Sequence, residues 1–353
     1  MTGGSPRRTI ESVQHLRALA ALGVVVFHAL ALLGDRLNVD VAHKELGAAG
    51  VDLFFIISGF IMWVTAINRD ETPGGFAWKR TLRIVPMYWL ITTFVLAIVL
   101  IRPQLMNSAS RDPFHFIASY FFVAWPHPTV DGRFWPPVIP GWTLNYEMFF
   151  YAVVTVSLFL PRYRRIQFIG LILAGLPFIG AFLKPTGIAA FYTDPILLEF
   201  FYGIILGTRF TMGREQGPRA SIALMLLGLI LLFTVGLYGN DHNRGVMWAI
   251  PLALVVQGAL HAPALAMGAV RKASKLLGDA SYSLYLTQFV VLPPSAMVMS
   301  KFVGSWPLAV AVPVFVVGLV LLAVAGGITA YFLAERPILR AAQAWRGKPA
   351  ATR

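Results

Sequence analysis

The chain has 353 residues, of which 57% are hydrophobic and only 13% are charged, and its mean hydropathy is +0.69. Soluble proteins carry about 25% charged residues, so the composition argues against a soluble domain, a coiled coil or a disordered chain. The net charge is +13. In a membrane protein such an excess indicates basic cytoplasmic loops. We therefore expect these charges to interact with membrane lipids and not with nucleic acid. The absence of cysteine excludes disulfides and a cysteinyl acyl intermediate.

Ten segments are long and apolar enough to cross a membrane, which takes about 20 residues in a helix. They predict an all-α integral membrane protein of about ten transmembrane helices, with one membrane-embedded domain over residues 1–345 and a short basic tail at 346–353. The expected spans are 16–33, 46–67, 82–101, 142–160, 166–183, 191–210, 219–239, 245–264, 281–302 and 308–334.

The basic residues are divided unequally between alternate loops. The two termini and every second loop hold 21 of the 29 Lys and Arg residues, and the remaining loops hold 8. Because cytoplasmic loops carry the excess of basic residues, we expect both termini in the cytoplasm and the long loop 102–141 outside the cell.

The loop 102–141 contains seven prolines, too many for a continuous helix. Within it, the stretch from Phe114 to Trp125 is apolar but too short to span the membrane, and it predicts an interfacial or re-entrant piece. Two interpretations stay open: an aromatic belt at the outer surface, or a lid over an outward-facing site.

The first span carries two ionisable side chains, Arg17 near its inner boundary and His28 in its outer half. Eleven residues turn a helix by about 1100°, so the two lie within about 20° of one face and about 16 Å apart along the axis. Ionisable groups inside a membrane are costly and indicate function. The alternatives are a snorkelling anchor for Arg17 and a buried imidazole bonded to a carbonyl for His28.

Two carboxylates are expected at the depth of His28. Asp52 enters the second span about 9 Å below the outer face, and Glu147 lies in the outer half of the fourth span. A carboxylate that orients a histidine ring makes it a better general base. We therefore predict that His28, Asp52 and Glu147 form a catalytic group. The alternative for Asp52 is a charge that favours a helix N-terminus.

Ser58 is followed by Gly59 in the second span. Small residues permit close helix approach, and no Gly-x-Ser-x-Gly elbow surrounds Ser58. Packing is therefore favoured over a nucleophilic serine.

Arg80 and Arg83 are one helical turn apart at the cytoplasmic end of the third span. Guanidinium groups bind phosphates in a bidentate manner, so the pair predicts a phosphate site, with the anionic headgroups of lipids as the alternative ligand. No phosphate-binding glycine motif is present. No histidine pair has metal-ligand spacing, so we expect no metal.

These segments together resemble the acyltransferase-3 family of integral-membrane acyltransferases, and among them the exopolysaccharide O-acetyltransferase-like members. The resemblance spans nearly the whole chain. It rests on six motifs in order: Leu16-Arg17-Ala18 to His28, Gly50-Val51-Asp52 to Phe60, Arg80-x-x-Arg83 to Trp89, Trp142-Thr143-Leu144 to Tyr151, Ser281-Tyr282-Ser283-Leu284-Tyr285-Leu286, and Glu335-Arg336-Pro337.

The resemblance implies transfer of an acyl group, usually acetyl, from cytoplasmic acyl-CoA to a hydroxyl of a cell-surface or exported glycan, at a bacterial-type plasma membrane. Its functional residues match Arg17, His28, Arg80 and Arg83. One departure is Gln288, where the family often has histidine, so a proton-transfer role at this position is in doubt.

The expected mechanism follows from both lines of argument. Arg17, Arg80 and Arg83 would hold the coenzyme A phosphates, and His28, oriented by Asp52 or Glu147, would remove the proton of the acceptor hydroxyl. Several further side chains are candidates for an oxyanion donor, a substrate contact or a structural role: Ser58, Asn145, Tyr146, Tyr285, Gln288 and Glu335. A polytopic transporter and a non-catalytic glycan-binding membrane subunit are the alternative functions.

The charge distribution gives a testable topology. A reporter that is active only in the cytoplasm should be active when it is fused to the C-terminus and inactive when it is inserted in the loop 102–141. An external C-terminus would contradict the prediction.

Overall fold

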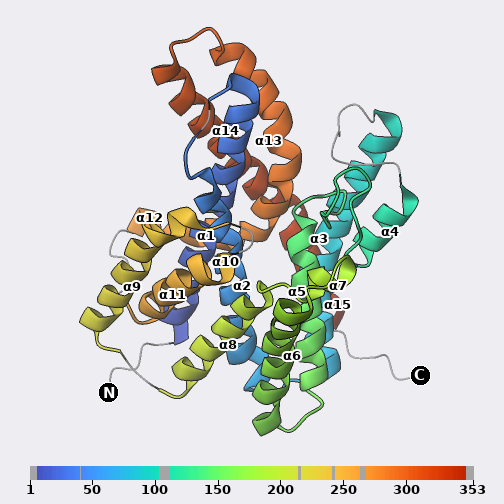
Figure 1. Cartoon of the computed structure of the whole chain (residues 1–353), viewed down its shortest axis with the longest axis vertical. Helices are drawn as coiled ribbons and strands as arrows, with labels where there is room; N and C mark the ends of the chain where they lie inside the picture. The colour runs from blue at the N-terminus through green and yellow to red at the C-terminus, as the bar shows by residue number, and fades with distance from the viewer. Residues whose placement is uncertain are drawn as a thin grey trace.

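The computed structural model describes residues 6–39, 41–102, 112–213, 216–240, 243–262 and 268–346. All the regular elements in these ranges are helices, as Figure 1 shows. Eight of them are long and apolar enough to cross a membrane: Glu11–Leu37, Lys44–Ile67, Pro73–Ile101, Arg162–Leu183, Ile188–Thr211, Pro218–Tyr238, Ser281–Val303 and Leu308–Ala342. The predicted class, an all-α integral membrane protein, is confirmed.

The remaining two expected spans fall on shorter helices. The segment 142–160 contains α5 (Gly141–Ser157), and the segment 245–264 contains α10 (Arg244–Met247) and α11 (Ala249–His261). The 13 residues of α11 rise by only about 20 Å, less than the roughly 30 Å of hydrocarbon. The break at Trp248, between α10 and α11, shortens the continuous helix.

The other helices follow the expected order. They are α1 (Pro6–Leu37), η1 (Lys44–Ala48), α2 (Ala49–Met62), η2 (Trp63–Ile67), α3 (Pro73–Ile101), α4 (Pro113–Tyr120), α6 (Arg162–Leu183), α7 (Ile188–Tyr192), α8 (Leu197–Thr211), α9 (Pro218–Leu232), η4 (Val235–Tyr238), α12 (Gly268–Asp279), α13 (Ser281–Val303), α14 (Leu308–Ala330), η5 (Tyr331–Glu335) and α15 (Arg336–Arg346).

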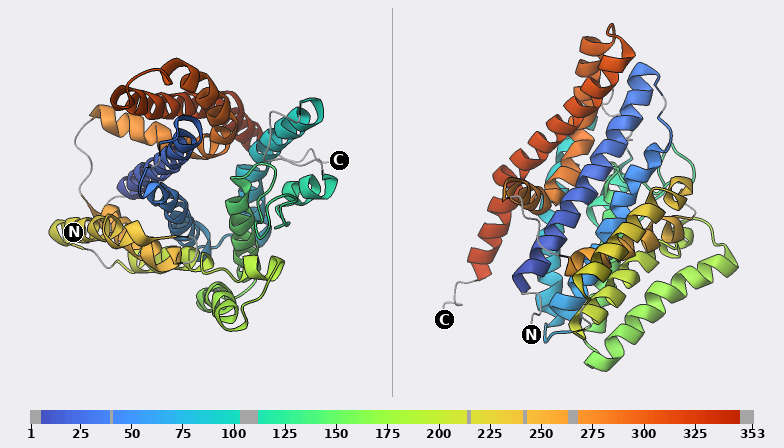
Figure 2. Two further views of the ribbon diagram at one scale, coloured as in Figure 1. Left: turned by 45° about the horizontal axis from the view of Figure 1, so that its top comes forward. Right: turned by 90° about the vertical axis from the view of Figure 1, so that its left-hand side faces the viewer.

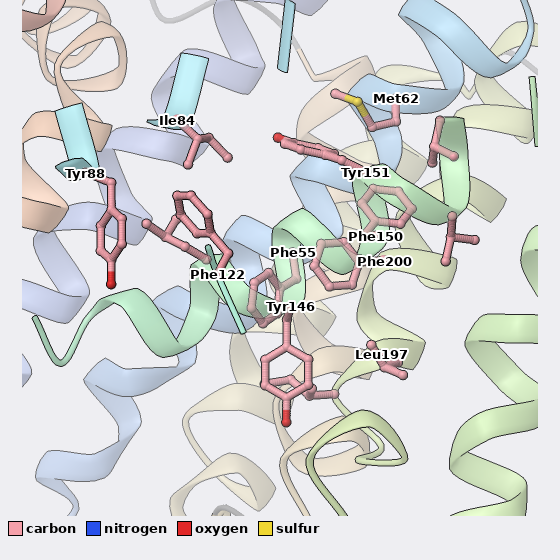
Figure 3. Close-up of a cluster of buried hydrophobic side chains, with 14 of the residues drawn as sticks. Phe55, Met62, Ile84, Tyr88, Phe122, Tyr146, Phe150, Tyr151, Leu197 and Phe200 are labelled. Atoms are coloured by element: carbon pink, nitrogen blue, oxygen red, sulfur yellow. The ribbon is translucent and has the colours of Figure 1, made fainter. Parts of the chain in front are cut away.

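The helix α2 lies at the centre of the bundle, between α1, α5 and α8 (Figure 1). Its side chain Phe55 packs on Phe200 of α8, with ring centroids 4.5 Å apart, and Phe200 packs on Phe150 of α5 at 4.4 Å. Figure 3 shows this aromatic group in the main hydrophobic core. Because α2 is enclosed by other helices, its polar side chains lie inside the bundle.

Two glycines set the distance between α2 and α8. A Cβ atom added at Gly59 would lie 2.0 Å from the carbonyl oxygen of Phe200, and one added at Gly203 would lie 2.0 Å from that of Ile56. The backbones are therefore in direct contact, as small residues permit in membrane helices. The packing role predicted for the Ser58-Gly59 pair is confirmed at Gly59.

The long loop 102–141 contains the eight-residue helix α4, so the expected short, non-spanning piece is present. It lies beside α3: Trp89 Nε1 donates a hydrogen bond to the carbonyl oxygen of Tyr120 at 2.9 Å, and the hydroxyls of Tyr88 and Ser119 are 2.8 Å apart. Residues 103–111 of this loop, and residues 347–353 of the expected basic tail, lie outside the described residues.

The first turn of α1 and the last turn of α15 lie at the same end of the bundle (Figure 2). This arrangement is compatible with two termini on one side of a membrane, although the side itself stays a prediction from the charges. The helix α15 was not expected as a separate element, and it follows a π-helical segment, η5, at the end of α14. Single π-helical turns of this kind occur frequently at functional sites.

The close contact of α2 and α8 predicts the effect of one added methyl group. Gly203→Ala or Gly59→Ala should lower the melting temperature of the detergent-solubilised protein, because overpacking costs about 1–3 kcal/mol. Gly74→Ala is the control, since a Cβ atom there meets nothing within 4 Å. Equal melting temperatures for Gly203→Ala and Gly74→Ala would contradict the contact.

Candidate active site

A cavity lies among α1, α2, α3, α5 and α13. It encloses about 770 Å³ of space between the protein atoms, part of which is open to solvent. Three arginines and one glutamate line it: Arg17, Arg80, Arg83 and Glu147. The rest of the lining is mainly apolar and aromatic. Cations concentrated in an otherwise apolar cavity favour an anionic or strongly polar ligand with an apolar portion.

Arg80 lies in this cavity with one donor unused. Its guanidinium is 5.5 Å from the ring centroid of Phe76 and 5.9 Å from that of Tyr151, an arrangement that stabilises a cation. Its Nε atom is buried and has no hydrogen-bond partner among the described residues. A buried N–H without a partner is costly, so this donor fits a ligand that accepts a hydrogen bond.

Arg83 is held by an ion pair with Glu335, and the two side chains are in direct hydrogen-bond contact. The other carboxylate oxygen of Glu335 accepts a hydrogen bond from Ser283 Oγ. Because Glu335 is 2% exposed, this pair joins α3, η5 and α13 inside the protein. Arg17 is anchored in a similar way, since it donates a hydrogen bond of 2.9 Å to Ser281 Oγ.

Glu147 accepts two hydrogen bonds in the same cavity, one from the Tyr151 hydroxyl and one of 3.3 Å from Ser58 Oγ. Ser58 therefore donates a hydrogen bond to the Glu147 carboxylate inside the cavity. Glu147 is partly accessible, so it faces the cavity as an acceptor beside the three arginines.

Asp52 lies away from this cavity and is bound by Arg244 of α10. The guanidinium donates two hydrogen bonds to the carboxylate, of 3.0 Å from Nε and 2.7 Å from Nη2. It also lies 5.7 Å from the ring centroid of Trp142 and 5.3 Å from that of Trp248. Glu199 is next to the pair, with one oxygen 4.0 Å from Arg244 Nε.

His28 has a different environment from the one predicted. Its Nδ1 atom is 3.0 Å from the carbonyl oxygen of Val24, one turn earlier in α1, and its ring meets that of Phe27 edge to face. No hydrogen bond or ion pair joins it to Asp52 or Glu147 in the part of the chain that the structure describes. It is also absent from the lining of the cavity.

The predicted contact of His28 with Asp52 or Glu147 is thus not formed. Asp52 is occupied by Arg244, and Glu147 by Ser58 and Tyr151. Sequence reasoning missed Arg244 because it begins a four-residue helix at the edge of an expected span and was counted as a loop cation. The one available signal was an unpaired carboxylate, Asp52, inside an apolar segment, since such a charge requires a partner.

The remaining predicted side chains are buried near these groups. The Tyr146 hydroxyl donates to the carbonyl oxygen of Phe191 at 2.9 Å, so it is not free as an oxyanion donor. The Tyr285 hydroxyl is 2.9 Å from Thr143 Oγ1, and Gln288 Nε2 donates to the carbonyl oxygen of Tyr285 at 3.0 Å. Asn145 is 1% exposed, and its Oδ1 atom has no partner among the described residues.

The fold and cavity define a polytopic membrane protein with an internal basic site. Comparison with known families then gives the class of reaction: the chain belongs to the acyltransferase-3 family, whose model, described as an acyltransferase domain, matches residues 10–331. It is therefore a membrane acyltransferase, as the sequence motifs predicted.

The chain is similar to three named relatives. The exopolysaccharide production protein ExoZ of Rhizobium meliloti is 38% identical over 335 residues, which cover 91% of this chain and 96% of the relative. The acyltransferase MdmB of Streptomyces mycarofaciens is 26% identical, over 94% of this chain and 92% of the relative. The O-acetyltransferase OatA of Staphylococcus aureus is 25% identical over 88% of this chain, which spans only 53% of that relative. No solved structure matches the chain.

The buried pair Asp52–Arg244 predicts a large effect on stability. Asp52→Asn should destabilise the protein by about 3–5 kcal/mol, because it removes the carboxylate that accepts two hydrogen bonds from the buried guanidinium, and Glu199 reaches that guanidinium only at 4.0 Å. The triple variant Asp52→Leu, Glu199→Leu and Arg244→Met should recover much of this loss, since it removes all three buried charges together. Thermal unfolding in detergent measures both effects.

The control is Arg271→Met, which breaks the partly exposed Arg271–Glu11 pair. Exposed pairs contribute roughly 0–1 kcal/mol, so this change should have little effect. A wild-type melting temperature for Asp52→Asn would contradict the structural role of the pair.

Proposed function

We propose that this acyltransferase moves an acetyl group from cytoplasmic acyl-CoA to a hydroxyl of a cell-surface or exported glycan, across a bacterial plasma membrane. The observation that carries the proposal is the cavity with Arg17, Arg80 and Arg83 in an apolar setting. Coenzyme A combines phosphates with a long, weakly polar arm, so it matches this combination. The printed names of ExoZ and OatA, which refer to exopolysaccharide production and O-acetyl transfer, support a glycan acceptor and an acetyl group.

The cavity supplies the donor side of the reaction in this proposal. Guanidinium groups bind phosphate oxygens in a bidentate manner, and an ionised partner makes such hydrogen bonds stronger. Arg80, whose Nε atom is buried without a partner, is the side chain best placed to gain a hydrogen bond from a ligand. Arg17 and Arg83 flank it in the same cavity.

We assign the general base to His28. The Nδ1 atom lies 3.0 Å from the carbonyl oxygen of Val24, and a ring nitrogen in that position carries the proton and donates it. The proton on Nδ1 leaves Nε2 with its lone pair, which is the form of imidazole that accepts a proton. His28 is half-buried, so an acceptor hydroxyl can approach it.

The step balances without a cofactor. The acceptor oxygen attacks the thioester carbonyl carbon, its proton passes to His28 Nε2, and the carbon–sulfur bond breaks. The leaving thiolate then takes the proton, which gives free coenzyme A and the O-acylated glycan. The proposed step is a direct transfer, without an acyl-enzyme intermediate.

In this proposal the two substrates bind toward opposite ends of α1. Arg17 and His28 are eleven positions apart, which corresponds to about 16 Å of helix. The donor would therefore enter near Arg17 with its acyl group directed along α1, and the acceptor would arrive at the His28 end. Glu147, the carboxylate that lines the cavity itself, is the competing candidate for the base.

The test compares three variants for acetyl transfer per mole of folded, donor-binding protein, with radiolabelled acetyl-CoA and polysaccharide from a deletion strain. His28→Ala should lower transfer by roughly 10²–10⁴-fold, the range for general acid–base groups, and leave donor binding intact. His261→Ala is the matched control, because its Nδ1 atom also lies near the carbonyl oxygen one turn earlier, that of Gln257. It should retain wild-type activity.

The pH profile separates catalysis from structure. Wild-type transfer should rise with pH as the His28 ring loses its proton, because only the neutral ring is a base. If His28→Ala keeps more than about a tenth of wild-type transfer and Glu147→Gln loses the larger part, the base is Glu147.

A further inference from the structure

A second pocket opens beside the cavity, at the end of the bundle where α1 begins and α15 ends. Four arginines line it, two from the cavity and two from α15: Arg17, Arg83, Arg336 and Arg340. Because Arg17 and Arg83 line both spaces, the second pocket and the cavity meet at these two side chains. Arg336 belongs to the Glu335-Arg336-Pro337 motif, and Arg340 lies one helical turn after it.

Two of the four arginines in this pocket have a hydrogen-bond or ion-pair partner, and the two from α15 do not have one among the described residues. Arg83 is paired with Glu335, and Arg17 donates to Ser281. Arg336 lies 5.4 Å from the ring centroid of Phe332, and neither it nor Arg340 makes a hydrogen bond or an ion pair with another described residue. The one carboxylate that lines the pocket is Asp279. The two α15 cations are therefore free to bind an anion.

The geometry of α15 favours one polyanionic ligand. Residues four apart lie on one face of a helix, so Arg336 and Arg340 point to the same side, as their shared pocket also indicates. Two guanidinium groups on one face can hold a diphosphate or a phosphate monoester in a bidentate manner. Arg340 is exposed, so a soluble ligand can reach it.

We propose that Arg336 and Arg340 form an entrance subsite for the phosphates at the nucleotide end of the acyl-CoA donor. The uncharged arm of the donor would then pass between Arg17 and Arg83 into the cavity beside Arg80 and Glu147, with its reactive end directed toward the His28 end of α1. This inference rests on the proposed function and changes which arginines bind the donor phosphates. The α15 arginines bind the phosphates. Arg83 is already neutralised by Glu335, so it lines the opening between the second pocket and the cavity and does not hold a phosphate.

An anionic lipid headgroup offers the same phosphate chemistry. We favour the soluble donor because the pocket adjoins an internal cavity and shares Arg17 and Arg83 with it, which a headgroup at the surface does not require. The two ligands are separated by measuring coenzyme A binding in nanodiscs of phosphatidylcholine alone and again with phosphatidylglycerol added.

The test uses the variants Arg340→Gln and Arg336→Gln/Arg340→Gln. Both should bind coenzyme A more weakly in the neutral nanodiscs, the double variant by about 10-fold or more. The ratio of kcat/KM for acetyl-CoA to that for acetyl-pantetheine, which lacks the nucleotide phosphates, should fall by a similar factor. Arg219→Gln, an exposed arginine of α9, is the charge-matched control and should match the wild type.

Three results would overturn the inference. An unchanged donor ratio in both variants shows that the α15 arginines do not contact the phosphates. Equal loss for both donors indicates a general structural effect. Wild-type coenzyme A binding, combined with loss of a response to phosphatidylglycerol, indicates a lipid site.

If Arg336→Gln does not fold, Arg340→Gln and the charge reversal Arg340→Glu carry the test, with the larger loss expected for Arg340→Glu. Failure of the wild type to bind coenzyme A would instead refute the proposed function itself.

Discussion

The ion pair between Arg83 and Glu335 is the contact on which the site depends. It joins the third transmembrane helix to the π-helical end of α14, and Ser283 ties the same carboxylate to α13. Removing Arg83 would leave the buried Glu335 carboxylate without its cation, which is destabilising. The pair therefore holds the start of α15 against α3 and α13, and it lies where the cavity and the second pocket adjoin.

A single constraint, that charge inside a membrane needs a partner, divides the ionisable residues into two kinds. Arg244 and Asp52 satisfy each other, with aromatic rings of Trp142 and Trp248 around the cation. Arg80 keeps a buried donor that has no hydrogen-bond partner in the part of the chain that the structure describes. The first kind holds helices together, and the second is available to a ligand. The proposed donor path uses the second kind, from the exposed Arg340 to Arg80.

The sequence predicted much of this arrangement because depth in a membrane can be counted along a helix. The spacing of Arg80 and Arg83 placed both on one face, and both line the cavity with Arg17 and Glu147. The glycine after Ser58 indicated close helix packing, and Gly59 does touch α8.

Counting residues along a helix gives the depth of a side chain in the membrane, but it does not show which neighbouring helix that side chain faces. Asp52 and His28 were assigned similar depths, yet Asp52 faces α10 and pairs with Arg244. The break before α11 and the separate helix α15 were missed for a related reason, since hydropathy records apolar length and not the start and end of each helix. The pocket lined by Arg336 and Arg340 becomes visible only when the end of the chain is folded against α1 and α3.

The central claim is that the donor occupies the arginine-lined cavity and enters it past α15. A cryo-electron microscopy map of the protein in nanodiscs with a non-hydrolysable acetyl-CoA analogue tests it most directly. The account predicts density for the uncharged arm of the donor between Arg80 and Glu147, and density for the nucleotide phosphates at Arg336 and Arg340. Donor density elsewhere, such as at the separate pocket beside Arg69 and Arg162, with the arginine-lined cavity empty, would contradict it.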